Sequence, residues 1–87
     1  MPRYLTFHTL ACLTRQGAAQ LVERFRQAPD VRTVRAQVNL QEGKMLIEWE
    51  AADREPLEAW LNSEKMHRDW LMRVELEARE GPLEPAV

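Results

Sequence analysis

Five side chains in this 87-residue sequence are able to bind a transition-metal ion. They are two histidines, the single cysteine and two of the glutamates, namely His8, Cys12, Glu48, Glu50 and His67. Mixed nitrogen, sulfur and carboxylate donors suit borderline divalent ions such as Ni²⁺ or Zn²⁺, whereas Mg²⁺ and Ca²⁺ prefer oxygen donors alone. No compact motif joins the five residues, so they form a metal site only if the fold brings them together.

Each candidate ligand also has an ordinary structural interpretation. A single histidine on a sheet, such as His8, is often a hydrogen-bonded structural residue, and His67 at a helix end can complement the helix dipole. Cys12 can act as a small hydrophobic residue. The two glutamates can pair with Arg35 or Arg73 on a solvated sheet face. Both interpretations stay open from the residues alone.

Hydrophobic periodicity predicts the elements that must position these residues. Alternating apolar and polar residues predict strands over 4–9, 33–40, 45–50 and 70–77. A period of 3.6 residues predicts one helix from the N-cap Thr14 to about residue 28, and a second from the N-cap Asp53 to residue 65 or 67. The turn 41–44 contains a glycine and predicts a hairpin between the second and third strands.

The order βαββαβ predicts a ferredoxin-like α+β fold, with a four-stranded antiparallel-type sheet and both helices on one face. We expect the strand order 4-1-3-2, with the first and third strands as parallel central neighbours. Residues 1–80 would form this single domain. Residues 81–87 contain two prolines and a glycine without any period, which predicts a flexible C-terminal tail.

The alternation within each strand assigns side chains to the two faces of the sheet. Leu5 and Phe7 are expected to face the helices, and Tyr4, Thr6 and His8 the opposite side. The other residues expected under the helices are Val34, Ala36, Val38, Met45, Ile47, Trp49, Met72, Val74 and Leu76. With this topology the five candidate ligands would converge at one end of the sheet.

Composition limits the partners. The net charge of −2, from 12 basic and 14 acidic residues, leaves no basic footprint for nucleic acid or an anionic membrane. One cysteine excludes an intramolecular disulfide, and the start of the chain lacks the unbroken apolar run of a signal peptide, so a cytoplasmic location is expected. A second sheet face carrying Tyr4, Leu46 and Leu71 predicts a homodimer that covers it.

Three segments resemble a small ferredoxin-like family of unknown function, some of whose members are described as nickel-binding. The segments are Phe7–Thr14, Trp49–Asp53 and Arg73–Glu75, and the similarity would cover residues 3–77. The resemblance implies a homodimer whose two sheets face each other, and a nickel ion held by histidine and carboxylate side chains. Of the positions here, His8 is the one that carries over. The family often has Pro-Gly where this chain has Ala11-Cys12, which departs from the pattern of the first loop.

Three functions are compatible with this sequence, and a fold alone does not decide among them. The first is a metal-binding or metal-responsive dimer that uses the five candidate ligands. The second is a dimeric α+β barrel enzyme, of the kind that includes cofactor-free monooxygenases and lactone isomerases. Tyr4, Arg35 and Arg73 would line its pocket, with His8 as the general base. The third is a non-catalytic dimerisation module.

Overall fold

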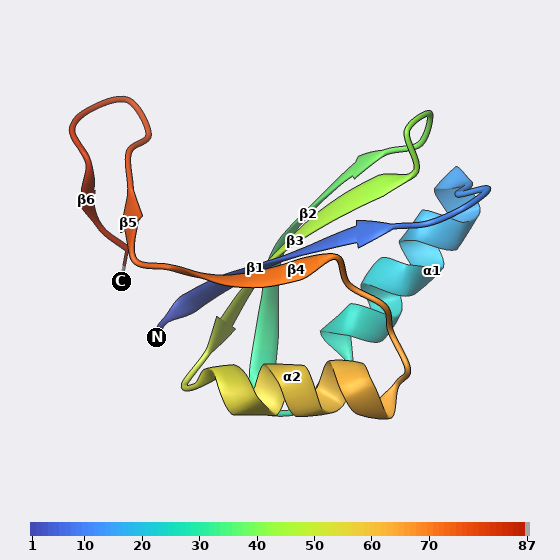
Figure 1. Ribbon diagram of the computed structural model, residues 1–87, viewed down its shortest axis with the longest axis horizontal. Helices are drawn as coiled ribbons and strands as arrows, with labels where there is room; N and C mark the ends of the chain where they lie inside the picture. Colours follow the sequence, from blue (N-terminus) through green and yellow to red (C-terminus); the bar gives the residue numbers. More distant parts are fainter. Residues whose placement is uncertain (87) are drawn as a thin grey trace.

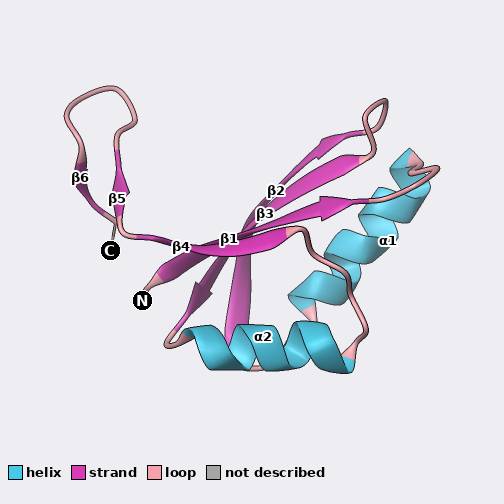
Figure 2. Ribbon diagram, viewed as in Figure 1, coloured by secondary structure: helices cyan, strands magenta, loops and turns pink. Residues whose placement is uncertain are grey.

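The computed structural model describes residues 1–86 and contains one four-stranded sheet, two helices and a small two-stranded hairpin (Figures 1 and 2). The elements are β1 (Arg3–Thr9), α1 (Arg15–Arg26), β2 (Val31–Asn39), β3 (Lys44–Ala51), α2 (Arg54–Ser63), β4 (Trp70–Val74), β5 (Leu76–Glu77) and β6 (Glu84–Pro85). Both helices lie on the same side of the main sheet. This confirms the α+β class.

The main sheet has the order β2-β3-β1-β4, which is the expected order 4-1-3-2 counted from the other edge. All of its neighbouring strands are antiparallel. The expectation that the first and third strands run parallel is therefore wrong. The crossover through α1 makes β1 and β2 run in the same direction, and the tight hairpin after β2 then reverses β3.

The burial of β1 is opposite to the expected one. Tyr4, Thr6 and His8 are buried on the helix-covered face, where their partners on β3 are also buried. Leu5 and Phe7 lie on the open face of the sheet and are only partly buried. Apolar character alone misled the assignment, because the polar Thr6 and His8 are buried through hydrogen bonds to each other and to the core.

The same reversal applies to β4, because it pairs with β1. Trp70 lies beside Phe7 and Met72 beside Leu5, which places both on the open face with exposed fractions of 42% and 47%. Leu71 packs against the core in their place. The assignment of β3 is confirmed, since Met45, Ile47 and Trp49 are each fully buried beneath the helices. Ala51, which was not part of that assignment, is fully buried as well.

Strand β2 forms one edge of the sheet and is more exposed than expected. A β-bulge between Thr33 and Arg35 breaks its alternation and leaves Val34 exposed. Ala36 packs against the core as predicted, whereas Val38 is 41% exposed. The core therefore lies mainly under β1 and β3.

Both helices begin at the predicted caps. The side chain of Thr14 accepts a hydrogen bond from the Gly17 amide, and that of Asp53 accepts one from the Arg54 amide. Helix α2 ends at Ser63, earlier than expected, because Lys65 adopts a left-handed conformation with φ 55°. Among residues 1–86 no helix is both long and apolar enough to cross a membrane.

The turn after α2 is a Schellman motif. The Lys65 amide donates to the Asn62 carbonyl and the Met66 amide to the Leu61 carbonyl, which satisfies the last carbonyl groups of the helix. The chain then turns back to β4 through His67. This turn fixes where the backbone of His67 lies relative to β1.

Part of the C-terminal segment 81–87 takes part in a hairpin. Strand β6 pairs antiparallel with β5, and the Ala86 amide donates to the Glu75 carbonyl. The two strands form a hairpin arm that rises from the sheet on the side opposite α2 (Figure 1). Val87, the last residue of the predicted tail, lies outside the described residues.

The turn between β2 and β3 generates the first prediction. Gly43 has φ +66°, and a Cβ at this position would lie 2.4 Å from the Leu10 carbonyl oxygen. Gly43→Ala should therefore lower the free energy of unfolding by about 2 kcal/mol or more. Gly81→Ala, where a Cβ meets nothing within 4 Å, should change it by less than about 0.5 kcal/mol. Urea unfolding followed by tryptophan fluorescence measures both, and equal effects would contradict this account.

Candidate functional site

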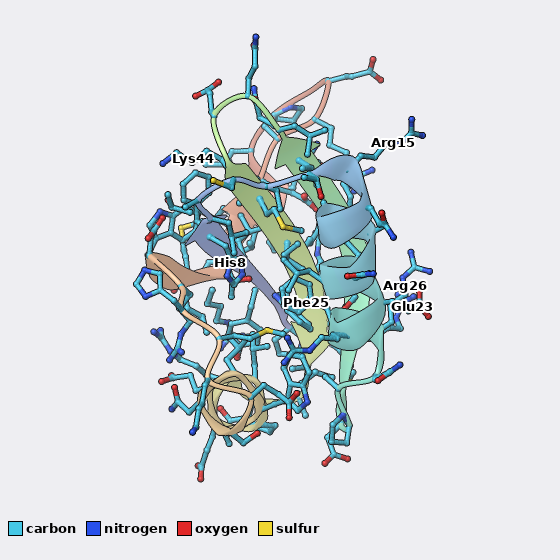
Figure 3. All side chains as sticks on the ribbon, turned by 90° about the vertical axis from the view of Figure 1, so that its right-hand side faces the viewer. His8, Arg15, Glu23, Phe25, Arg26 and Lys44 are labelled. Carbon is cyan, nitrogen blue, oxygen red and sulfur yellow. The ribbon has the colours of Figure 1, made fainter. Side chains whose placement is uncertain are left out.

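A cavity of about 310 Å³ lies where β1 ends, between α1 and the turn after α2. Its wall includes the imidazole of His8, the ring of Phe25 and the side chain of Met66. The rings of His8 and Phe25 are tilted against each other with centroids 5.4 Å apart, and Figure 3 shows both between the sheet and α1. At the exposed rim, Arg24 and Glu64 form an ion pair of 3.1 Å.

A chain of hydrogen bonds holds His8 in this wall. The indole Nε1 of Trp49 donates to Thr6 Oγ1 at 2.9 Å, and Thr6 Oγ1 lies 2.8 Å from His8 Nε2. His8 Nδ1 lies 2.8 Å from the backbone carbonyl of His67. A carbonyl only accepts, so Nδ1 carries the proton, and the Thr6 hydroxyl then donates to Nε2. Both ring nitrogens are therefore occupied in a neutral imidazole.

The electrostatics of the site favour the same neutral form. His8 is 3% exposed, and this burial lowers its pKa because the protonated ring would lose its hydration. The hydrogen bond to the His67 carbonyl and the charge of Asp69 oppose the shift without cancelling it. A proton on Nε2 would also meet a hydroxyl oxygen that already accepts from Trp49.

The side chain of His67 points away from His8 and into solvent. Its Nε2 lies 3.1 Å from Asp69 Oδ1, and the side chain is 75% exposed. Asp69 accepts a hydrogen bond from Thr9, which in turn accepts one from Lys44. These contacts lower the pKa of Asp69, with the hydrogen bond from Thr9 as the main cause. His67 meets His8 through its backbone carbonyl alone.

The fold brings together only part of the predicted metal site. Glu48 and Glu50 lie on the open face of β3, opposite Leu5 and Arg3, whereas His8 is buried on the other face. Cys12 is exposed in the loop after β1. Within residues 1–86, no three His, Cys, Asp or Glu side chains are grouped closely enough to hold a metal ion. Within one copy these five residues therefore do not share a site, and the predicted nickel or zinc site stays a prediction.

The pocket expected for an enzyme is likewise divided between the two faces. Tyr4 is 2% exposed in the core beneath the helices. Arg35 lies on the open face, where it pairs with Glu48 at 3.6 Å. Arg73 lies opposite Tyr4 at the exposed edge strand β4. His8, which would act as base, already uses both of its ring nitrogens.

A second candidate site is the open face of the sheet, which the sequence predicted to be largely polar apart from Tyr4, Leu46 and Leu71. We call its central residues the apolar face, and they are Leu5, Phe7, Leu46, Trp70 and Met72. The rings of Phe7 and Trp70 are stacked with an angle of 3° between their planes and centroids 5.4 Å apart. The sequence predicted that a second copy covers this face, but it placed Tyr4 and Leu71 there, whereas the structure places Leu5, Phe7, Trp70 and Met72 there beside Leu46.

An ionic cluster lies on the open face beside the first residue of β1, whereas Phe7 and Trp70 lie near the other end of the strand. Arg3 donates to Glu48 at 3.0 Å and also pairs with Glu77 of the hairpin arm. Arg32 pairs with Glu50 at 2.7 Å. These hydrogen bonds from arginine lower the pKa of Glu50 and of Glu77. The open face thus has an apolar end and a charge-compensated end.

Comparison of the chain with models of known protein families, with curated proteins and with solved structures finds no significant match. The resemblance to a nickel-binding family stays a prediction.

The buried imidazole generates a prediction about pH. Because the pKa of His8 is lowered in the folded chain, the unfolded chain binds its proton more readily below the ordinary value of 6.5. The free energy of unfolding should be constant above about pH 7, fall as the pH drops below about 6.5, and level off once folded His8 is also protonated. Urea unfolding at closely spaced pH values measures this slope.

Two variants separate His8 from the rest of the molecule. His8→Gln, which does not titrate, should lose the slope between about pH 5 and 7. His67→Gln should keep it, because its backbone carbonyl remains. Glu50, Asp69 and Glu77 all have lowered pKa values and titrate at lower pH. An unchanged slope in His8→Gln would show that another group is responsible.

Proposed function

We propose that this chain is a non-catalytic dimerisation module of ferredoxin-like fold, in which a second copy covers the open face of the sheet. The observation that carries the proposal is the exposed apolar face. Trp70 and Met72 are 42% and 47% exposed in the single chain, and both lie beside Phe7 and Leu5. Contiguous apolar surface of this kind marks an interaction site in a monomeric domain.

The size of the chain supports the same conclusion. A chain of 87 residues buries a limited share of its unfolded surface, and one side of this sheet has no covering layer among residues 1–86. A standard interface buries about 800 Å² on each partner, which is the scale of one sheet face. Aromatic residues such as the stacked Phe7 and Trp70 are typical of interface centres.

The charges of the open face favour a second copy over a strongly charged partner. The ionic cluster contains four arginines and three glutamates, which are Arg3, Arg32, Arg35, Arg79, Glu48, Glu50 and Glu77. Four positive and three negative charges leave a net charge of only +1, so two identical faces meet with little repulsion. Closed two-fold association of identical surfaces is also the commonest form of oligomer.

The hairpin arm adds to this surface. It rises on the side of the sheet away from α2, and its Leu76 and Leu83 are 53% and 63% exposed. The ion pair between Arg3 and Glu77 ties the arm to the end of β1. An arm in this position would extend the contact area past the edge of the sheet.

Metal binding and catalysis are not part of this proposal. The predicted ligands lie on different faces, and both ring nitrogens of His8 already have hydrogen-bond partners. Coordination or proton transfer at His8 would first have to break the bond to Thr6 or to the His67 carbonyl. The dimer needs no such rearrangement, since its surface is already exposed.

The proposal predicts the mass of the chain in solution. Light scattering on the purified chain at micromolar concentration should give twice the 10.2 kDa of one copy. The double variant Trp70→Glu/Met72→Glu should give the mass of one copy, because four buried like charges cannot be accommodated in a symmetric contact. Circular dichroism should show that the variant keeps its secondary structure.

A matched control uses exposed apolar residues outside the apolar face. Val34 and Leu40 are 38% and 42% exposed, close to the value for Trp70. Val34→Glu/Leu40→Glu should leave the dimer intact. A monomeric wild-type chain would overturn the proposal, and so would a dimer that the control dissociates and the Trp70→Glu/Met72→Glu variant does not.

A further inference from the structure

A groove lies on the opposite side of α1 from His8. It has a volume of about 580 Å³ and runs between α1 and the edge strand β2. Its apolar floor comes from Ala18 and Val22 of α1 and from Ala36, Val38 and Leu40 of β2 and the following turn. We call this feature the α1–β2 groove.

The groove lies along an unpaired strand edge. Strand β2 hydrogen-bonds to β3 on one side and has no partner on the other among residues 1–86. The bulge between Thr33 and Arg35 interrupts the edge, but residues 36–39 beyond it follow a regular register with β3. Four residues of strand span about 13 Å and offer free amide and carbonyl groups beside the apolar floor.

Two arginines stand at the two ends of the groove. Arg15 and Arg26 are both exposed and line it, and Figure 3 shows them, with Glu23, on the side of α1 away from His8. Neither arginine forms an ion pair within residues 1–86. Eleven steps along the helix separate them by about 16 Å, the length of roughly five strand residues.

We propose that the α1–β2 groove binds an extended acidic peptide that adds as a strand to the edge of β2. Main-chain hydrogen bonds to residues 36–39 would supply the pairing, and a small apolar side chain would contact the floor. Because alternate strand residues share a face, acidic residues at positions i and i+4 face α1 together with the apolar residue at i+2. The long side chains of Arg15 and Arg26 span the remaining few ångströms to the two carboxylates.

The structure favours a peptide over two other occupants. An amphipathic small carboxylate would leave the free amides and carbonyls of β2 unused and would contact one arginine. A second copy of this chain would bring a groove of net charge +1, from Arg15, Arg26 and Glu23, against an identical one, which is repulsive. An acidic peptide uses both the strand edge and the arginines.

A selection experiment tests the peptide sequence. Random heptapeptides displayed on phage are selected against the full chain in its native oligomeric state. The expected enrichment is for Asp or Glu at positions i and i+4 with Val, Ala or Thr at i+2. Enrichment of peptides without acidic residues, or no enrichment, would overturn the proposal.

The selected peptide is then synthesised and titrated calorimetrically into variants. Arg15→Glu/Arg26→Glu should weaken binding about tenfold or more, because two charge-assisted contacts become repulsive. Lys65→Glu/Arg73→Glu, an equal change at two exposed cations that lie away from the groove, should leave the affinity within about twofold. Equal loss in the two variants would reduce the effect to overall charge and contradict a site in the groove.

N-methylation of the peptide tests strand addition itself. Alternate amides of a strand point to the same side, so methylating one alternate set should abolish binding and methylating the other should change it little. Equal tolerance of both sets would overturn strand pairing. If decanoate competes with the peptide at equal affinity, the groove is a site for small carboxylates and the proposal is wrong. If Arg15→Glu/Arg26→Glu dissociates a dimer of the chain, the groove pairs two copies and the proposal is likewise wrong.

Discussion

The hydrogen-bond chain from Trp49 through Thr6 and His8 to the His67 carbonyl decides how this sheet is oriented. A strand can bury either of its two faces, and a shift of one residue exchanges them. In β1 the polar face is buried because the Thr6 hydroxyl and the His8 imidazole find partners there. An unpaired buried hydroxyl or imidazole would cost about 1–3 kcal/mol. Burial of this face therefore requires every hydrogen bond from Trp49 to the His67 carbonyl to form.

The orientation of β1 determines the chemistry of both surfaces. Burying His8 withdraws its imidazole from catalysis and coordination, and at the same time it turns Phe7 outward. Phe7 then stacks on Trp70, and the open side of the sheet becomes apolar. Burial of the face of β1 that carries Thr6 and His8 therefore has two results, a buried imidazole and an exposed apolar surface. The ionic cluster around Arg3 confines the apolar area to one end of the sheet.

Much of the architecture could be predicted from the sequence, and the site could not. The periods, the two caps at Thr14 and Asp53 and the strand order are local or topological properties, and they are confirmed. The direction of β3 relative to β1 follows from the hairpin turn and was misjudged, which wrongly placed Glu50 beside His8. Which face of β1 is buried depends on hydrogen bonds between residues more than 40 positions apart. The hydrophobicity of the residues along β1 does not predict such bonds.

The Schellman turn at Lys65 supplies His8 with a partner that has no side chain, the carbonyl of residue 67. Any amino acid except one that distorts the backbone can provide that oxygen, so substitution at position 67 should leave the hydrogen bond to His8 intact. The number of residues between α2 and β4 is not free, because an insertion or deletion would move the oxygen out of reach. Among homologues, this connection should therefore keep its length while its side chains vary. An alignment would show this constraint as an absence of insertions and deletions and not as conserved residues.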